Sequence, residues 1–289
     1  MSSSDKDNGN QQHDNDENDE NDTTTTSELS SLWTKEAGIP PGASGEELQD
    51  LWYKKAAQWY EDHCPPTVNG VLGGFATISD KDLDGSKLFL QEVLALNLNL
   101  DWTRGAACEC GAGIGRVTRG LLLDLNVTQV DLIESSERLL FEAPDYVGSH
   151  ARADRCRYYC SGLQDWSPPT ENRYTIIWIQ WVLCYLTDED AIAFLQRCAK
   201  GLLRKTTTST TDGDNDNNMQ YQGIIVLKEN VCGDGEHYVV DHDDASVCRS
   251  LEYWLQLVDK AGLKVVYQKM QDDFPSDIFP VPMLALVPM

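Results

Sequence analysis

Two stretches of this 289-residue chain are dominated by apolar residues, and they restrict its fold more than any other feature. They are Tyr174–Gln180 (YTIIWIQ) and Gly223–Glu229 (GIIVLKE). Neither stretch alternates apolar and polar residues, as a strand with one solvated face would. A short continuous apolar run is instead typical of a strand that is buried on both faces. We therefore expect a sheet that has helices packed on both sides.

Segments with strand and helix patterns alternate along the rest of the chain, which predicts a doubly wound α/β fold. We expect helices over Glu46–Glu61, Ser86–Leu96, Gly115–Asp124, Ser136–Ala143, Asp188–Leu203 and Ser246–Ala261. Ser86 is expected to be the N-cap of the second of these helices. Further strands are expected over Gly105–Glu109, Gln129–Glu134, Arg157–Cys160, Lys264–Lys269 and Val281–Val287. The last two strands are joined by too few residues for a helical crossover, so they should pair antiparallel at the edge of a mixed sheet.

Two segments are too polar to contribute to a core. Residues 1–45 and 205–222 are rich in Asp, Asn, Ser and Thr, and such segments bury too little apolar surface to offset the loss of chain entropy. We expect the first to be a disordered acidic tail and the second to be a low-complexity surface insertion. A single domain is then expected over residues 46–289, with a helical cap over residues 46–100.

Charge and cysteine content narrow the choice of partners and compartment. The net charge is −24, and the residues after position 30 still carry −16 of it, which disfavours nucleic acid and favours a cationic or neutral partner. No apolar run reaches the length of a membrane span. The nine cysteines include no CxxC pair, and the N-terminus lacks a signal-peptide pattern. We expect a monomer with reduced thiols and no metal site, located in the cytoplasm, the nucleus or both.

A glycine-rich turn lies between a predicted strand and a predicted helix, within Ala106–Leu121 (AACECGAGIGRVTRGL). Its glycines would let backbone N–H groups approach a ligand closely. The spacing GxGxG is one residue shorter than the dinucleotide fingerprint GxGxxG. Glu134 ends the next strand, where an acid can bind a ribose diol. The turn and this acid predict a nucleoside-bearing cofactor, while Glu109, just before the glycines, could face an ammonium group.

The order acid-x-Gly-x-Gly-x-Gly, followed by an acid at the end of the second strand, resembles class I S-adenosylmethionine-dependent methyltransferases. This resemblance implies a seven-stranded, Rossmann-like mixed sheet with helices on both faces, an N-terminal helical extension, and S-adenosyl-L-methionine as the cofactor. The runner-up is a dinucleotide-dependent oxidoreductase. The short glycine spacing and the antiparallel terminal strands count against it.

Several strings resemble one family more closely, the protein α-N-terminal methyltransferases that modify Xaa-Pro-Lys N-termini. They occur in the family's order, between about residues 52 and 286, at Pro65–Gly74 (PPTVNGVLGG), Glu109–Arg116 (ECGAGIGR), Gly162–Trp166 (GLQDW), Ile177–Val182 (IWIQWV), Gly223–Asn230 (GIIVLKEN) and Ser246–Arg249 (SVCR). The resemblance implies methylation of the α-amino group of protein substrates that have free Xaa-Pro-Lys N-termini. A class I methyltransferase for a small-molecule amine, and a catalytically weak protein that binds N-termini, stay open as alternatives.

The resemblance also implies a set of cofactor-binding residues. At the methionine end of the cofactor we expect Gly111, Gly113, Arg116 and Gln180. Glu134 is expected at the ribose, and Leu163 and Gln164 at the adenine. The open side of the cofactor is expected to be covered by Trp59 or its neighbour Tyr60. On the substrate side it implies that Leu72 and Gly73 line a channel for the first residues and that Trp181 packs against the proline. Asn230 is expected to bind the first residue's carbonyl or amine. Near the amine and the lysine, two acids are expected, Asp241 and Asp244.

The sequence departs from the family where the catalytic residues are expected. Tyr185 stands where the family commonly has a catalytic His, and a phenol with a pKa near about 10 is a poor base at neutral pH. We therefore expect Asp244 to be the main base and Tyr185 to orient the amine. His237 and His242 lie close by in sequence, and either could substitute as the base. Phe279 replaces the usual Tyr, which removes one hydroxyl from the pocket.

Overall fold

The computed structural model describes residues 32–96, 98–205, 220–233 and 235–289. The chain before Ser44 groups as a unit of its own, and its described part contains one π-helical turn, Leu32–Glu36. Most of the predicted acidic tail, residues 1–31, lies outside the described residues, as do residues 206–219 of the predicted insertion. The other described helices and strands all belong to the second unit, Ser44–Met289.

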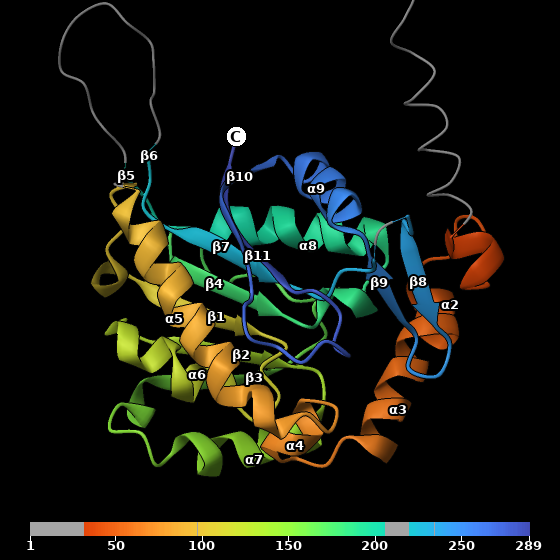
Figure 1. Ribbon diagram of the computed structural model, residues 1–289, viewed down its shortest axis with the longest axis horizontal. Helices are drawn as coiled ribbons and strands as arrows, with labels where there is room; N and C mark the ends of the chain where they lie inside the picture. The colour runs from red at the N-terminus through yellow and green to blue at the C-terminus, as the bar shows by residue number, and fades with distance from the viewer. Residues whose placement is uncertain (1–31, 97, 206–219, 234) are drawn as a thin grey trace, which may run out of the picture. The chain divides into compact units, whose positions relative to one another are not determined.

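Seven strands form one mixed sheet in the order β10-β11-β7-β4-β1-β2-β3 (Figure 1). All neighbours are parallel except β11, which runs antiparallel to both β7 and β10. In chain order the strands are β1 (Ala106–Cys110), β2 (Val130–Glu134), β3 (Cys156–Cys160), β4 (Tyr174–Gln180), β7 (Ile224–Lys228), β10 (Leu263–Met270) and β11 (Pro282–Pro288). The predicted mixed sheet and its antiparallel last pair are confirmed.

The two apolar runs form the centre of this sheet. Every residue of β4 and of β7 is buried. On one face, Ala107, Ile176 and Trp178 pack in a single cluster with residues of α5 (Ser79–Ala95), α6 (Arg116–Gly120) and α7 (Glu137–Val147). On the other, Cys110 of β1 contacts Cys198 of α8 (Asp188–Gly201), beside which α9 (Leu251–Lys260) packs. Helices therefore cover both faces, as expected.

Helices also precede the sheet. Residues 45–63 form one continuous helical segment made of α2 (Gly45–Leu48), the π-helical Gln49–Tyr53 and α3 (Lys54–His63), which confirms the helix expected there. α4 (Val68–Val71) follows, capped by Thr67. The prediction of an N-cap at Ser86 is wrong, because α5 begins at Ser79 with two acids in its first turn. The Ser86 hydroxyl instead lies inside the helix, where it donates to the Asp82 carbonyl.

The helix expected over Ser246–Ala261 is also partly wrong. Its first residues form β9 (Ser246–Arg249), which pairs antiparallel with β8 (Tyr238–Asp241), and the helix starts only at Leu251. Burial alternates along β9, with Val247 and Arg249 inward, which is a strand period rather than a helical one. Ser250 then caps α9.

Two shorter features complete the second unit. The helix predicted over Gly115–Asp124 is α6 followed by a 3-10 turn, Leu122–Leu125. The strands β5 (Arg204–Lys205) and β6 (Gln220–Tyr221) pair at the two ends of the insertion.

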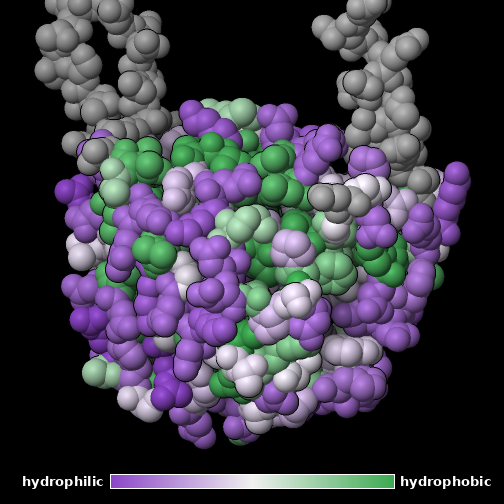
Figure 2. Space-filling view, viewed as in Figure 1, coloured by the Kyte–Doolittle hydropathy of each residue, from purple (hydrophilic) through white to green (hydrophobic). Residues whose placement is uncertain are grey.

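Hydrophilic side chains cover much of the face shown in Figure 2. Within the described ranges, no helix combines the length and the apolar character needed to cross a bilayer.

Candidate active site

Glycines occupy the three positions of the turn between β1 and α6 that have a left-handed backbone. Gly111, Gly113 and Gly115 all have left-handed φ values, of 69°, 54° and 81°. A Cβ on Gly111 would lie 2.6 Å from the Val182 side chain. The backbone therefore turns sharply at the end of β1, and its N–H groups border a cavity at the carboxyl ends of the parallel strands.

This first cavity encloses about 430 Å³. It contains all the predicted cofactor residues but one, namely Gly111, Gly113, Arg116, Glu134, Leu163, Gln164 and Gln180. Trp59 is the exception, because it lines only the neighbouring cavity and stacks on His63, with 5.1 Å between the ring centroids. Its neighbour Tyr60 lines both cavities. The structure thus favours Tyr60, the alternative, as the aromatic residue beside the cofactor.

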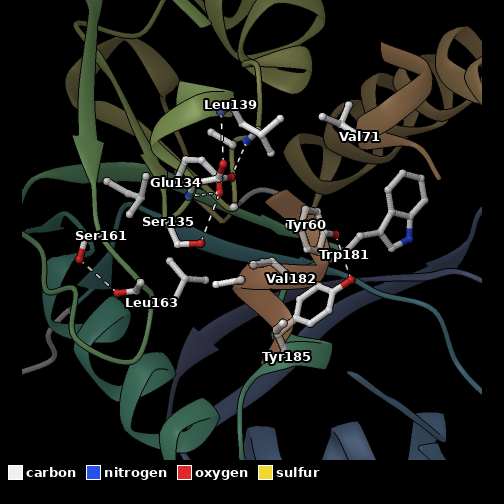
Figure 3. A pocket seen from close by; sticks show the side chains of 18 of the residues that line it. Tyr60, Val71, Glu134, Ser135, Leu139, Ser161, Leu163, Trp181, Val182 and Tyr185 are labelled. Atoms are coloured by element: carbon white, nitrogen blue, oxygen red, sulfur yellow. Dashed lines mark hydrogen bonds between the residues drawn. The ribbon is translucent and has the colours of Figure 1, made fainter. Parts of the chain in front are cut away.

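Glu134 ends β2 inside the first cavity (Figure 3). Its carboxylate accepts hydrogen bonds from the backbone N–H groups of Gly113 and Ser136, both at 2.8 Å, and from the Ser135 hydroxyl. Burial raises the pKa of this carboxyl, although the same N–H groups partly offset the effect. Glu134 therefore links the glycine turn to the start of α7, where a ribose diol would bind.

Glu109 lines the first cavity and also binds the start of the next helix. Its two carboxylate oxygens accept from the backbone N–H groups of Val117 and Thr118 in the first turn of α6. Burial raises its pKa to about 7. The residue that the sequence offered as a possible cation partner thus also caps a helix from within the cavity wall.

Arg116 fits the carboxylate of an amino-acid moiety. The residue is 5% exposed and lines the first cavity. Its Nη2 pairs with Oδ2 of Asp82 at 2.7 Å, whereas its buried Nη1 has no partner among the described residues. A buried cationic donor without a partner is costly, and a ligand carboxylate would satisfy it. This orphan group is the observation that matches the cavity to the methionine end of S-adenosylmethionine.

Asp82 of α5 was not expected in the site, yet it holds two of the predicted residues. Besides Arg116, its Oδ1 accepts from the Gln180 amide at 2.8 Å and pairs with Nζ of Lys228 at 2.6 Å. Gln180 in turn accepts from the Trp178 indole N–H at 2.8 Å. Burial alone would raise the Asp82 pKa, but Lys228 and Arg116 hold it below its ordinary value. Burial also lowers the pKa of Lys228 to about 8.

A second, larger cavity of about 1230 Å³ adjoins the first. Every predicted substrate residue lines it, namely Leu72, Gly73, Trp181, Asn230, Asp241 and Asp244. The two cavities share a wall made of Tyr60, Val71, Leu72, Trp181 and Tyr185. His242 and Phe279 also line the second cavity, whereas His237 does not. A group in the second cavity can therefore reach one in the first only past this wall.

Trp181 stands in the shared wall in an unusual backbone conformation. Its φ is 53°, which is uncommon for a bulky residue, and it is held there by a hydrogen bond from its N–H to the Lys228 carbonyl. The next two N–H groups, of Val182 and Leu183, both donate to Oε1 of Glu229. Such strain is found where function requires a particular side-chain position.

Three hydroxyl and carboxyl groups form a chain across the wall. The Tyr60 and Tyr185 hydroxyls lie 2.9 Å apart (Figure 3). The Tyr185 hydroxyl donates to Oδ2 of Asp244 at 3.4 Å. Burial raises the pKa of both tyrosines well above the ordinary value, so both stay neutral. Burial, with Asp241 nearby, also raises the pKa of Asp244. Tyr185 can thus donate to Asp244 but cannot act as a base at neutral pH.

Three buried polar atoms of the second cavity lack partners in the described part of the chain. They are the Trp181 indole nitrogen, Oδ1 of Asn230 and Oδ1 of Asp244. Buried polar groups are normally paired, so these atoms indicate a ligand with both donors and an acceptor. The acids of the lining are Glu229, Asp241, Asp243, Asp244 and Asp277, and none of the described residues that line it is a Lys or Arg. A cationic ligand suits this charge.

The fold and the first cavity define a class I S-adenosylmethionine-dependent methyltransferase. A solved S-adenosylmethionine-dependent methyltransferase of Leishmania major superposes with a TM-score of 0.71, at 29% identity over 89% of this chain and 90% of that one. The 1,6-didemethyltoxoflavin-N1-methyltransferase of Burkholderia thailandensis, solved with S-adenosylhomocysteine, has the same fold at a TM-score of 0.58 and 13% identity, over 87% of this chain and 95% of that one. The oxidoreductase alternative is therefore set aside.

The chain belongs to the family of AdoMet-dependent proline di-methyltransferases, whose model matches residues 49–287. Its relatives include the N-terminal Xaa-Pro-Lys N-methyltransferase 1 of Danio rerio, 41% identical over 83% of this chain and 97% of that protein. The protein of the same name from Homo sapiens is 38% identical over the same shares. The resemblance read from the sequence is confirmed, and with it an enzyme that uses S-adenosylmethionine.

Proposed function

We propose that this enzyme methylates the α-amino group of proteins whose N-termini read Xaa-Pro-Lys. The names of its relatives support this assignment, and the second cavity carries it. There, two acceptor oxygens without a partner, on Asn230 and Asp244, lie beside the wall that this cavity shares with the cofactor cavity. An α-amine has N–H donors for both acceptors, and one pair of electrons left for a methyl group.

Asp244 is the base in this proposal. An α-amine has a pKa of about 7.7–8.0, so part of it is neutral near physiological pH, and desolvation increases that part. Asp244 takes the remaining ammonium proton, directly or through a water, while Tyr185 holds the other carboxylate oxygen. S-adenosylmethionine bound in the first cavity would supply an electrophilic methyl group: the amine lone pair would form the N–C bond as the C–S bond breaks, and S-adenosylhomocysteine would be the leaving group. Catalysis then rests mainly on positioning.

The rest of the tripeptide fits the remaining lining. Trp181 offers a flat apolar surface for the proline ring, and its free indole N–H can donate to a peptide carbonyl. Leu72 and Gly73 border the channel. Asp241, beside Asp244, provides the negative charge that a lysine at the third position requires.

A catalytically weak N-terminus-binding protein is the second candidate, and the replacement of the expected His by Tyr185 is the observation that favours it. The orphan donor of Arg116 and the intact glycine turn argue against it, because a pure binder needs neither. A small-molecule amine is less suited to a cavity of this size and charge.

A peptide panel tests the substrate assignment. The enzyme is incubated with S-adenosylmethionine and with Ser-Pro-Lys-Arg, Ser-Ala-Lys-Arg or Ser-Pro-Glu-Arg, and the initial rates are compared. We expect the first peptide to exceed the other two in kcat/KM by at least about tenfold, a difference of roughly 1.4 kcal/mol in transition-state binding. Equal rates with all three would contradict recognition of Pro and Lys.

The wider setting of the enzyme follows from the same proposal. Its partners are proteins with free N-termini, which occur in both the cytoplasm and the nucleus. We infer that it acts there as a monomer, since one chain supplies both cavities. Light scattering of the purified chain tests this: a mass near 32.3 kDa is expected, and twice that mass would contradict it.

A further inference from the structure

Arg138 lies outside both cavities, yet it contacts the helix that forms part of each. It lies two residues after Ser136, the N-cap of α7, whose N–H donates to Glu134. Its Nη2 donates to the carbonyls of Tyr60, Glu61 and Cys64, at 2.9, 2.8 and 2.8 Å. Its Nε pairs with the Glu61 carboxylate at 3.2 Å. One side chain thus gathers the carbonyl groups at the C-terminal end of α3.

The Tyr60 carbonyl also accepts from the backbone N–H of Cys64 at 3.0 Å, so the carbonyls of Glu61 and Cys64 are the ones that depend on Arg138. The last carbonyl groups of an α-helix have no N–H donor within the helix, and the C-terminus of the helix carries a partial negative charge. A guanidinium satisfies both conditions with one planar group. The Glu61 pair adds little, since that side chain is 54% exposed. The carbonyl contacts are therefore what fixes the end of α3 against α7.

The end of α3 matters because it walls both cavities. Ala57, Tyr60 and Glu61 line the first cavity, and Trp59 and Tyr60 line the second. Arg138 binds the Tyr60 carbonyl, while the Tyr60 hydroxyl meets that of Tyr185. A shift of this helix end would widen the cofactor cavity and disturb the chain that leads to Asp244.

We propose that Arg138 is a positioning residue, which fixes Tyr60 between the two cavities and so controls both cofactor retention and alignment of the acceptor amine. The first half of this inference concerns the cofactor cavity alone. The second half, which concerns the peptide, rests on the proposed function.

The test compares Arg138→Ala and Arg138→Lys with Arg155→Ala as a matched control. Arg155 also donates to a backbone carbonyl, that of Val127 at 2.7 Å, but it lines neither cavity. The dissociation constant of S-adenosylhomocysteine is measured by calorimetry without peptide. The KM and kcat for Ser-Pro-Lys-Arg are measured at saturating S-adenosylmethionine, and melting temperature is followed for every variant.

We expect Arg138→Ala to weaken S-adenosylhomocysteine binding about tenfold and to lower kcat, with Arg138→Lys recovering part of both. Arg155→Ala should keep both values within about twofold, even if it melts earlier. Binding by Arg138→Ala that stays as tight as that of Arg155→Ala would overturn the inference. If Arg138→Ala does not fold, the comparison of Arg138→Lys with Arg155→Ala decides it in the same way. A wild-type enzyme that methylates no peptide would refute the proposed function and leave the S-adenosylhomocysteine comparison intact.

Discussion

Asp244 combines half-burial with one free carboxylate oxygen, and both properties determine how the enzyme should respond to mutation and pH. Asp244→Asn should lower kcat by on the order of 10²-fold, as expected when a general base is removed, and should leave S-adenosylhomocysteine affinity unchanged. In the wild type, kcat should fall as the pH falls through the Asp244 pKa, because the protonated carboxyl cannot accept a proton. Burial places that pKa above the ordinary 3.8.

Steady-state kinetics between pH 5 and 9 provides the check. A loss of only a few-fold in Asp244→Asn would mean that Asp244 is not the base. His242 would then become the candidate, because it lines the same cavity and His237 does not.

Asp82 is the residue whose loss should affect the cofactor cavity most without touching the ligand. Asp82→Asn leaves the cations of Arg116 and Lys228 without their buried counter-charge, which costs about 3–5 kcal/mol in stability. It should also weaken S-adenosylhomocysteine binding, because Arg116 and Gln180 lose the group that orients them. Calorimetric binding and urea unfolding measure the two effects.

Asp131→Asn is the matched control for this prediction. Asp131 is likewise buried and paired, with Arg173 at 2.7 Å, but its partners Arg173 and Tyr174 do not line the first cavity, whereas Arg116 and Gln180 do. Both variants should lose stability, and only Asp82→Asn should lose affinity. An equal loss of affinity in the two would mean that the effect is one of general destabilisation.

The local sequence pattern predicts the central strands of the sheet but not the β8–β9 hairpin. β4 has the bounds predicted and β7 lies within those predicted, because continuous apolar runs bury on both faces whatever their neighbours. The string SVCR was read as helix because the helix α9 follows it directly. Its strand conformation depends on pairing with β8, and its buried Arg249 binds Asp188, 61 residues away. Contacts at that separation leave no local pattern.

The candidate site shows the same limit. The cofactor and substrate residues expected from the resemblance line the two cavities, and of the cofactor residues only Trp59 lines the second cavity without the first. Asp82 and Lys228 were missed, although each leaves a signal. Asp82 is a charge on the face of α5 that also carries Phe89 and Val93, and Lys228 is a charge in a strand buried on both faces. Such charges must be paired, but only the structure shows with what.

The loop after β7 offers a test of buried charge at this scale. Burial raises the Glu229 pKa from 4.5 to about 7, so the folded state binds more protons than the unfolded state between these values. Stability contributed by this group therefore falls as the pH rises from 4.5 to 7, and the loss persists above pH 7. Glu229→Gln keeps the single oxygen that accepts both N–H groups and removes the charge.

We expect Glu229→Gln to raise the free energy of unfolding by on the order of 2 kcal/mol at pH 8 and by much less at pH 5. Glu109→Gln is the control, because Glu109 uses both oxygens and the amide would lose one bond. Urea unfolding at the two pH values gives both numbers. A gain that is equal at pH 5 and pH 8 would contradict the assigned pKa.

For the whole molecule, charge should assist the capture of its substrate. The chain carries a net charge of −24, and the described residues around the second cavity include five acids and neither Lys nor Arg. A cationic peptide is therefore attracted from a distance, and salt screens this attraction within about 10 Å at 0.1 M. We expect kcat/KM for Ser-Pro-Lys-Arg to fall several-fold between about 0.05 and 0.5 M NaCl. Ser-Pro-Gln-Gln should respond much less, and an equal response of the two peptides would argue against electrostatic capture.

The central claim is that the enzyme transfers methyl groups to a free α-amine. Mass spectrometry of Ser-Pro-Lys-Arg, incubated with the protein and S-adenosylmethionine beside an N-acetylated copy of the same peptide, tests it most directly. We expect mass gains in whole methyl units on the free peptide alone, and the size of the gain gives the number of methyl groups added. Equal labelling of the acetylated peptide, or none of the free one by a protein that binds S-adenosylhomocysteine, would contradict it.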